Sequence, residues 1–455
     1  MRIFASFLLS TAAVLPVWAG VDDPFATAAL APPIVAASRT PCATALPATA
    51  LTALDAVDLA LCNHPQTREV WAAARAQAAL VGVTRGAWLP TLNGTLASTR
   101  FQYENNPYSR NSAALNLVWL LYDFGLRSAN AENAAQLLNA ALATQDATLQ
   151  TLFLNALQTY YAAQATQAAV GASSLAERSA REAFQAADAR YAVGVATPAD
   201  RLQAQTALSQ AMLNRVKAEG EARNALGALA NALGLPAQQP IRLAELPALP
   251  AEVSFQKAVD TLIGEAQARR PDLQAAEAQF KAAEASVDVA RAQGRPSLSL
   301  GAGPLWQDSA GVTTRGNSIG LSLNVPLFSG FETTYRVQAA AAQAEVKAAQ
   351  RDRLRNQVAL DVWKAYQSLS TATQSLQMTA DLVASAEQSE RVALGRYKAG
   401  VGTVLDLLAA QSALASARLQ RIQAQLDWNV YRATLAQSMG ALDVTLLQPA
   451  AEGRP

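Results

Sequence analysis

Histidine and cysteine are nearly absent from this 455-residue sequence, which contains one histidine and two cysteines. These three residues cannot complete a typical four-ligand zinc site on their own. His64 stands between Asn63 and Pro65 with no serine and aspartate arranged for a catalytic triad, so we interpret it as a surface residue at a helix end. The Gly-Ala-Gly segment at Gly301 lacks the lysine of a phosphate-binding loop. The sequence therefore predicts no catalytic residue, no metal and no cofactor.

Charged residues are also scarce, at 16% of the chain, where about a quarter is usual. The net charge of +1 gives no electrostatic reason to expect nucleic acid as a partner. Half of the chain is apolar, and much of that half is alanine. Alanine is the best helix former but buries little area per residue. This composition favours long helices that pack through small side chains over one thick core.

Long apolar runs are missing beyond the N-terminus, so no transmembrane helix is predicted. Residues 1–19 are typical of a secretory signal peptide, with Arg2, an apolar stretch from Ile3 to Val17, and a cleavage site after Ala19. The stretch is too short for a membrane anchor, and no lipidation cysteine follows it. If the mature protein enters a membrane, it must use strands.

The two cysteines, Cys42 and Cys62, both stand near the expected mature N-terminus. An even pair in an exported protein is typical of a disulfide, which here would tie a proline-rich arm (residues 20–50) to the first helix. Two unpaired thiols are the alternative.

The chain consists of two tandem repeats of one unit. The segment RYAVGVATPADRLQAQTAL (Arg190–Leu208) recurs 206 residues later as RYKAGVGTVLDLLAAQSAL (Arg396–Leu414). The offset falls by one between Gly125 and Gly330, which requires one extra residue in the first copy near Leu121. The same offset of 206 relates three further pairs, which are Pro65 and Pro271, Pro90 and Pro296, and Gly234 and Gly440.

Each copy has the same expected order of elements. The first copy covers residues 51–235, with a helical stretch at Leu54–Arg85, a β-hairpin at 90–123 and long helices over 128–233. The second covers 254–447, with a helical stretch at Phe255–Gln293, a hairpin at 296–328 and long helices over 333–439. A proline-containing linker (236–253) joins the copies, and residues 448–455 form a tail.

Period-two alternation predicts the strands. In residues 114–122 and 318–328 every second residue is apolar; 297–303 also alternates, and 91–101 occupies the equivalent position. Polar loops are expected at 104–111 and 307–317. Aromatic residues bracket the strands, as in the interfacial girdles of a membrane sheet. They are Trp88, Tyr122, Phe124, Phe328 and Phe331 at one end, and Tyr103, Tyr108 and Trp306 at the other. The alternative is a soluble four-stranded sheet covered by helices.

No proline interrupts residues 128–192 or 333–399. About 65 helical residues would reach on the order of 100 Å. Apolar residues in the second stretch follow coiled-coil spacing, at Leu354, Val358, Val362, Ala365, Leu369, Leu376 and Val383. A periplasmic coiled-coil scaffold is therefore a competing interpretation.

Four strands cannot cross a membrane alone, because their open edges would leave backbone groups unpaired in lipid. Three chains would pool twelve strands into a closed barrel with a lumen, whereas the eight strands of two chains would be filled by side chains. We therefore expect an α+β membrane protein, a homotrimeric 12-stranded β-barrel with four strands per chain, continued by a long α-helical barrel.

The tandem repeat, the motifs LLYDFG (Leu120–Gly125) and PLFSG (Pro326–Gly330) and the paired RYxxGVxTxxD turns resemble the TolC-type outer-membrane efflux proteins. The resemblance spans roughly Leu51 to Leu447. Within that family, WLLYDFG and the missing lipidation site are most similar to type I secretion components of the cyclolysin-exporter kind. The resemblance implies a trimeric duct in the outer membrane with helices in the periplasm, docked on a periplasmic membrane-fusion adaptor and an inner-membrane ABC exporter or proton-driven pump.

The two turns have local explanations of their own. Gly194 and Gly400 stand where a helix end favours a left-handed residue. Thr197 and Thr403 are expected to be N-caps, each with an aspartate three residues later, as in a capping box.

The resemblance also implies roles at these turns. Adaptor contacts fall on Gly194, Val195, Thr197, Gly400, Val401 and Thr403. A closed aperture is formed by Asp406, and Tyr397 with Asp200 form a latch. Two departures weaken the match, because Ala409 replaces a second aperture carboxylate and Gly402 replaces a latch arginine. Three Asp406 carboxylates would bind cations and repel anions.

The function expected is a passive exit duct for unfolded protein exported by type I secretion, in contact with outer-membrane lipid. The alternative is the outer-membrane channel of a multidrug efflux pump.

Overall fold

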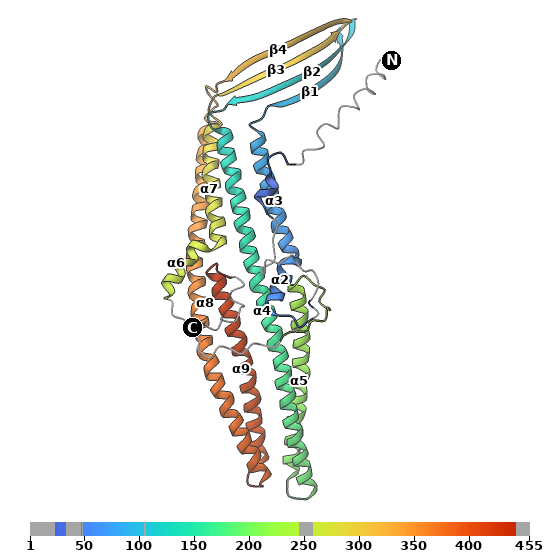
Figure 1. Cartoon of the computed structure of the whole chain (residues 1–455), viewed down its shortest axis with the longest axis vertical. Coiled ribbons are helices and arrows are strands. Elements are labelled where there is room, and N and C mark those ends of the chain that lie inside the picture. Colours follow the sequence, from blue (N-terminus) through green and yellow to red (C-terminus); the bar gives the residue numbers. More distant parts are fainter. Residues whose placement is uncertain (1–22, 33–46, 48, 104–105, 245–257, 443–455) are drawn as a thin grey trace, which may run out of the picture. The chain divides into compact units, whose positions relative to one another are not determined.

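The computed structural model describes residues 23–32, 47, 49–103, 106–244 and 258–442 (Figure 1). They belong to two compact units. The sheet unit is drawn from Met1–Pro33, Val70–Thr144 and Gln274–Arg353, and the turn unit from Ile34–Glu69, Gln145–Leu273 and Leu354–Pro455. The expected signal peptide, most of the arm, part of the linker and the tail lie outside the described residues.

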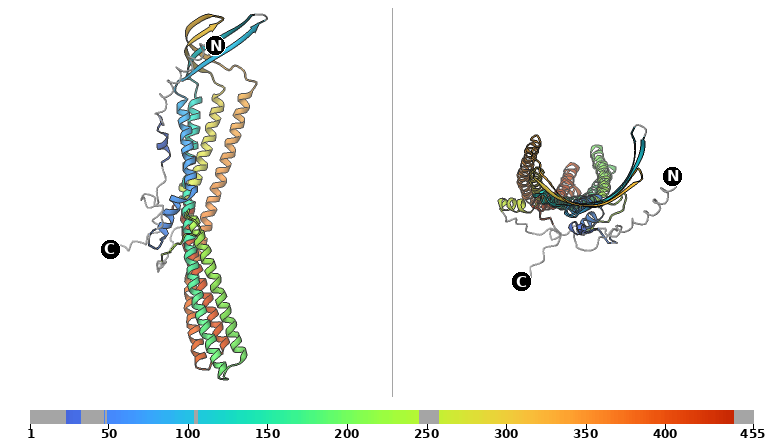
Figure 2. Two further views of the ribbon diagram at one scale, coloured as in Figure 1. Left: turned by 90° about the vertical axis from the view of Figure 1, so that its right-hand side faces the viewer. Right: turned by 90° about the horizontal axis from the view of Figure 1, so that it is seen from above.

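The sheet unit contains one antiparallel sheet of four strands in the order β1-β2-β3-β4. The strands are β1 (Thr91–Tyr103), β2 (Asn106–Tyr122), β3 (Ser297–Ser309) and β4 (Val312–Asn324). Seen from above, the sheet is curved (Figure 2). β1 and β4 are its two edges. All four strands overlap the segments predicted from the sequence, three of them predicted from alternation and β1 from its equivalent position in the repeat.

The expected polar loops at 104–111 and 307–317 are wrong. Residues 106–111 belong to β2, and β3 and β4 meet at the two-residue turn Ala310–Gly311. Strand pairing joins backbone groups, so polar side chains extend the ladder as well as apolar ones do. The last expected strand ends earlier than predicted, since β4 ends at Asn324, two residues before Pro326, which has no N–H to donate.

The extra residue of the first copy coincides with an irregularity in the sheet. Pairing between β2 and β3 shifts register between Leu120 and Tyr122, as at a β-bulge. Arg127 lies at this position and donates hydrogen bonds to the backbone carbonyls of Leu120 at 2.7 Å and Leu121 at 3.2 Å. Its buried guanidinium also pairs with Asp123 at 3.0 Å. The LLYDFG motif therefore supplies the bulge and the aspartate that holds Arg127 against it.

Among the described residues no helix covers the sheet (Figure 1), so the interpretation as a sheet covered by helices is wrong. Every residue of β4 is exposed, and Leu96 of β1 and Ile319 of β4 are 83% and 79% exposed. Apolar surface of this extent is a feature of protein or membrane contacts.

Each of the two expected helical stretches consists of two helices. α2 (Ala53–Asn63) and α3 (Pro65–Gly86) separate at His64, and α6 (Val259–Arg269) and α7 (Pro271–Ala292) separate at Arg270. His64 and Arg270 are extended, with ψ of 131° and 122°. Proline disfavours a helical conformation in the residue before it and suits the first position of a new helix.

The long helices match the prediction. α4 (Leu126–Ala192) and α8 (Glu332–Lys398) have 67 residues each, and α5 (Pro198–Ala232) and α9 (Val404–Ser438) have 35 each. In the turn unit α4 lies beside α5, and α8 beside α9 (Figures 1 and 2). Val358 and Val362 of the predicted coiled-coil pattern are fully buried. Within the described ranges, no helix contains an apolar stretch long enough to cross a membrane.

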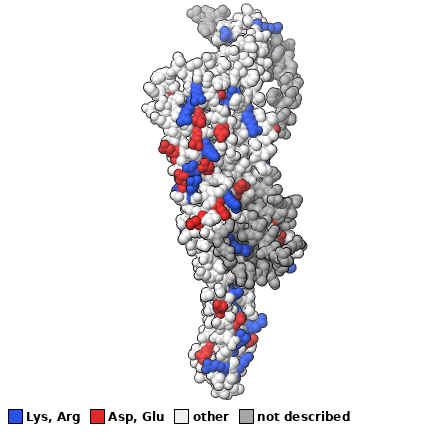
Figure 3. Space-filling model, turned by 60° about the vertical axis from the view of Figure 1, so that its left-hand side comes forward, with Lys and Arg blue, Asp and Glu red and all other residues white. Residues whose placement is uncertain are grey.

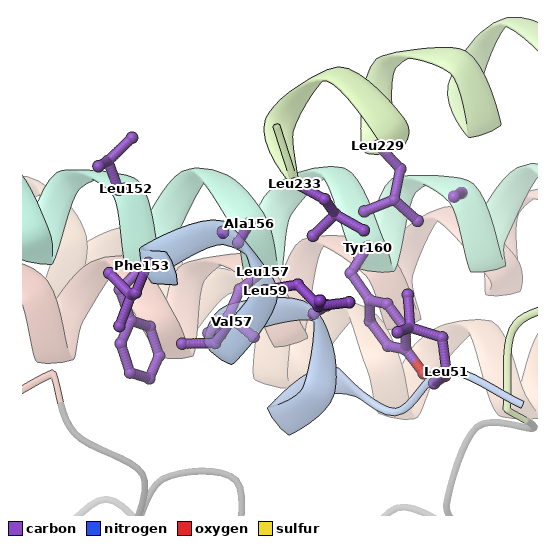
Figure 4. Packing of buried hydrophobic residues seen from close by; sticks show 14 of the residues in the cluster. Leu51, Val57, Leu59, Leu152, Phe153, Ala156, Leu157, Tyr160, Leu229 and Leu233 are labelled. Carbon is purple, nitrogen blue, oxygen red and sulfur yellow. Dashed lines mark hydrogen bonds between the residues drawn. The ribbon is translucent and has the colours of Figure 1, made fainter. Parts of the chain in front are cut away.

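The largest core of the turn unit forms where α2 packs on α4 and α5. Val57 and Leu59 of α2 face Leu157 of α4 (Figure 4). The Tyr160 hydroxyl donates a hydrogen bond of 3.0 Å to the carbonyl of Leu51, and burial raises the pKa of Tyr160 to about 12. Cys62 of α2 is disulfide-bonded, and Cys42, the other cysteine in the sequence, lies outside the described residues.

Candidate functional site

The turn between α4 and α5 and the turn between α8 and α9 are built alike. Gly194 and Gly400 have φ of 78° and 80°, the left-handed conformation that glycine adopts without strain. Gly194 N–H donates to the Tyr191 carbonyl and Val195 N–H to the Arg190 carbonyl, both at 3.0 Å. The second turn repeats this pattern 206 residues later. These bonds satisfy the last carbonyls of each long helix, and the predicted left-handed glycines are confirmed.

Each turn ends in a capping box, as predicted. The Asp200 carboxylate accepts hydrogen bonds from Thr197 N–H at 2.9 Å and from the Thr197 hydroxyl at 2.7 Å. These bonds hold the pKa of Asp200 below its ordinary value of 3.8. In the second box, Thr403 N–H donates to Asp406 at the longer distance of 3.4 Å. The exposed Asp406 carboxylate is therefore held less firmly than that of Asp200.

All six residues expected to contact an adaptor are exposed on the turns. Two of them are apolar, with Val195 72% and Val401 69% exposed. β-Branched apolar side chains at the tips of the turns offer a small apolar contact surface on each turn.

The ends of the two long helices are brought together in the turn unit. The Arg190 guanidinium lies 4.4 Å from the ring centroid of Tyr397 and donates to the Tyr397 carbonyl at 2.6 Å. Tyr397 is 4% exposed and packs in one apolar cluster with residues of all four helices. The other buried members are Ala183, Ala187, Ala204, Val404 and Leu407.

The expected latch residues have other partners in this structure. The ring of Tyr397 packs under Arg190, and the carboxylate of Asp200 binds Thr197 of its own turn. Arg190 was not singled out from the sequence, although the RY pair that begins both repeated segments was available as a signal. The contact itself joins two helices far apart in the chain.

Gly402, which replaces an expected latch arginine, has a local packing role. A Cβ atom at this position would lie 3.0 Å from Cβ of Arg396 and 3.1 Å from the Tyr397 nitrogen. The Gly402 N–H also donates to the Arg396 carbonyl at 3.1 Å. A larger residue would require the second turn to shift.

The charges around the helices are mixed in sign. On the face shown in Figure 3, acidic and basic side chains are interspersed. In the part of the chain that the structure describes, no three His, Cys, Asp or Glu residues gather closely enough to hold a metal ion.

Comparison with known proteins agrees with the repeat. The family model described as "Outer membrane efflux protein" matches residues 56–235 and 262–441. Protein CyaE of Bordetella pertussis is 34% identical over 93% of this chain and 90% of its own length. The alkaline protease secretion protein AprF of Pseudomonas aeruginosa is 28% identical over 87% of this chain and 85% of its own length. The structure of the outer-membrane channel OprN matches with a TM-score of 0.77 at 21% identity, covering 86% of this chain and 90% of that one.

Proposed function

Because the chain belongs to the outer membrane efflux protein family, we propose that it forms the passive exit duct of a tripartite export system and catalyses no chemistry. Members of this family are outer-membrane channels, and this chain is one of them. The family model matches both copies of the internal repeat, and this observation carries the proposal. The energy for transport then comes from an inner-membrane partner.

The duct is a homotrimer in this proposal. The two edge strands of the described sheet, β1 and β4, leave backbone donors and acceptors open. Such edges are not tolerated in lipid, so neighbouring copies must pair with them. Three copies would give twelve strands, enough to enclose a lumen. The exposed leucines and isoleucine of β1 and β4 would then contact outer-membrane lipid.

The turns are the proposed contact with the periplasmic adaptor. The six exposed turn residues, with Val195 and Val401 among them, offer a partner the same small surface twice per chain. Three chains would present it six times. We also propose that Asp406, Asp200 and Tyr397 form the aperture of the duct. The proposed disulfide partner of Cys62 is Cys42.

The proposed cargo is unfolded protein delivered by an ABC exporter. Two observations support it, the WLLYDFG motif and the similarity to a protein named for the secretion of an alkaline protease. The competing cargo is small toxic compounds delivered by a proton-driven pump, which the word "efflux" in the family description favours.

A deletion strain separates these cargoes. We expect one or more proteins to disappear from the culture medium, measured by mass spectrometry, while sensitivity to antibiotics and detergents is unchanged. The wild-type gene on a plasmid should restore secretion. Normal secretion together with increased drug sensitivity would contradict the protein cargo and favour the small-compound pump.

A further inference from the structure

The repeat relates the Arg190–Tyr397 contact to a second pair of residues. Arg396 is the counterpart of Arg190, and Tyr191 is the counterpart of Tyr397, both at the offset of 206. Within one chain, an arginine of the first repeat thus contacts a tyrosine of the second repeat. The reverse contact, between the arginine of the second repeat and the tyrosine of the first, would join Arg396 to Tyr191. In the single chain Tyr191 is 41% exposed, whereas Tyr397 is 4% exposed.

We propose that Arg396 of one chain binds Tyr191 of a neighbouring copy, in the same geometry in which Arg190 binds Tyr397 within a chain. The inference rests on the proposed trimer. Each chain contributes two repeats to the ring of three chains. Contacts from the first to the second repeat within a chain therefore alternate with contacts from the second repeat of one chain to the first repeat of the next. The partner that occupies this surface is therefore another molecule of the same protein.

Two residues beside the Arg190–Tyr397 contact are buried, whereas their counterparts beside Arg396 and Tyr191 are exposed, as expected for an interface without its partner chain. Ala183 on the Arg190 side is buried, while its counterpart Ser389 on the Arg396 side is exposed. Val404 on the Tyr397 side is buried, while its counterpart Pro198 on the Tyr191 side is exposed. Among the described residues, the Arg396 side chain has no hydrogen-bond or ion-pair partner. In the single chain Arg396 therefore lacks such a partner, and the partly exposed Tyr191 ring has Arg201 of its own chain 5.7 Å from its centroid.

The two contacts differ in chemistry. Within the chain, fully buried Leu407 and half-buried Leu394 pack in the cluster around Tyr397. Their counterparts in the first copy are Arg201 and Asp188, which form an ion pair of 2.5 Å beside Tyr191. Ion pairs near water are screened by salt, and apolar packing is not. Charged side chains thus stand where apolar ones pack around Tyr397, so we expect the contact between chains to be the weaker and more salt-sensitive of the two.

Site-specific photocrosslinking of the full-length protein in detergent tests this pairing. A benzophenone amino acid in place of Tyr191 should give a covalent dimer on a denaturing gel, with the link in residues 383–410 of the other chain. The matched control is the same amino acid in place of Tyr397, which should link within one chain and migrate as a monomer. Arg396→Ala should lower the yield of dimer severalfold, and Arg178→Ala, an exposed arginine elsewhere on α4, should not.

Salt gives a second measurement. Raising the salt from about 0.1 M to about 1 M shortens the Debye length from roughly 10 Å to 3 Å. The dimer yield from position 191 should fall severalfold, while the link from position 397 stays constant. A trimer in which position 191 links only within its own chain, or to another segment, would overturn the pairing. A protein that stays monomeric would instead overturn the proposed duct.

Discussion

The guanidinium of Arg190 stacks on the ring of Tyr397 and binds the backbone carbonyl of the same residue. One side chain thereby joins the end of α4 to the end of α8, and so joins the two turns on which the proposed adaptor contacts fall. Both parts of the contact use the planar guanidinium, whose face covers the ring while its N–H groups point at the carbonyl.

We expect Arg190→Ala to loosen both turns. A cation–π contact contributes about 0.5–2 kcal/mol, and a hydrogen bond from a charged donor about 1.5–3 kcal/mol. Because Arg190 is partly exposed, the free energy of local opening should fall by about 1–3 kcal/mol in all. Hydrogen exchange of the amides in residues 190–200 and 396–406 measures this. Arg178→Ala on the same helix is the control. Unchanged exchange at both turns would show that the apolar cluster alone holds them.

The capping box of the first turn predicts a dependence on pH. The hydrogen bonds from Thr197 lower the pKa of folded Asp200 below 3.8, so the charged form stabilises the start of α5. This contribution is complete above pH 3.8 and is lost as the pH falls through the lower pKa of the folded state. At neutral pH, Asp200→Asn should cost about 0.3–1 kcal/mol of local stability.

Hydrogen exchange at the start of α5, compared at neutral pH and well below pH 3.8, measures this difference. Wild type and Asp200→Asn should differ at neutral pH and converge in acid. A gap between the two proteins that persists in acid would mean that Asp200 acts through its shape rather than its charge.

Two glycines of β3 make a matched pair for testing the sheet. A Cβ atom on Gly303 would overlap the backbone oxygen of Leu115 on β2, whereas a Cβ atom on Gly301 would meet nothing within 4 Å. Backbone atoms cannot move aside as a flexible side chain can. Gly303→Ala should therefore destabilise the protein by about 1–3 kcal/mol, and Gly301→Ala should change stability by no more than about 0.5 kcal/mol.

Thermal unfolding in detergent and the heat-dependent gel shift of the trimer measure both variants. Equal unfolding temperatures for the two variants would show that β2 and β3 do not approach each other this closely at Gly303.

Features that depend on residues close together in the sequence, or on the sequence repeat, could be predicted. Gly194 and Thr197 carry strong helix-end signals, and a single change of offset in the repeat located the extra residue near Leu121, where the strand pairing shifts register. His64 was interpreted as a residue at a helix end because it precedes Pro65, and one helix does end and the next begin there. The polar residues 106–111 were assigned to a loop because side-chain polarity does not report backbone pairing. The partner of Tyr397 depends on the packing of α4 against α8, which local pattern cannot supply.

The aperture proposal can be tested by both loss and gain of charge. Asp406 is exposed and only weakly held by Thr403, so its carboxylate is free to bind an ion. Asp406→Asn keeps the size of the side chain and its ability to accept a hydrogen bond from Thr403 but removes the charge. In planar bilayers, we expect block of the single-channel current by divalent cations to weaken severalfold, because a trimer would lose three negative charges from one constriction.

Ala409 is exposed one helical turn after Asp406, so Ala409→Asp adds the second carboxylate that the TolC-type resemblance implies. The gain should strengthen cation block in a protein whose Asp406 is intact, and two rings of carboxylates should bind cations more tightly than one. Neither variant should change the amount of trimer in the outer membrane, which gel analysis of membrane fractions checks. If conductance and block are the same in wild type and both variants, Asp406 does not line the narrowest part of the duct.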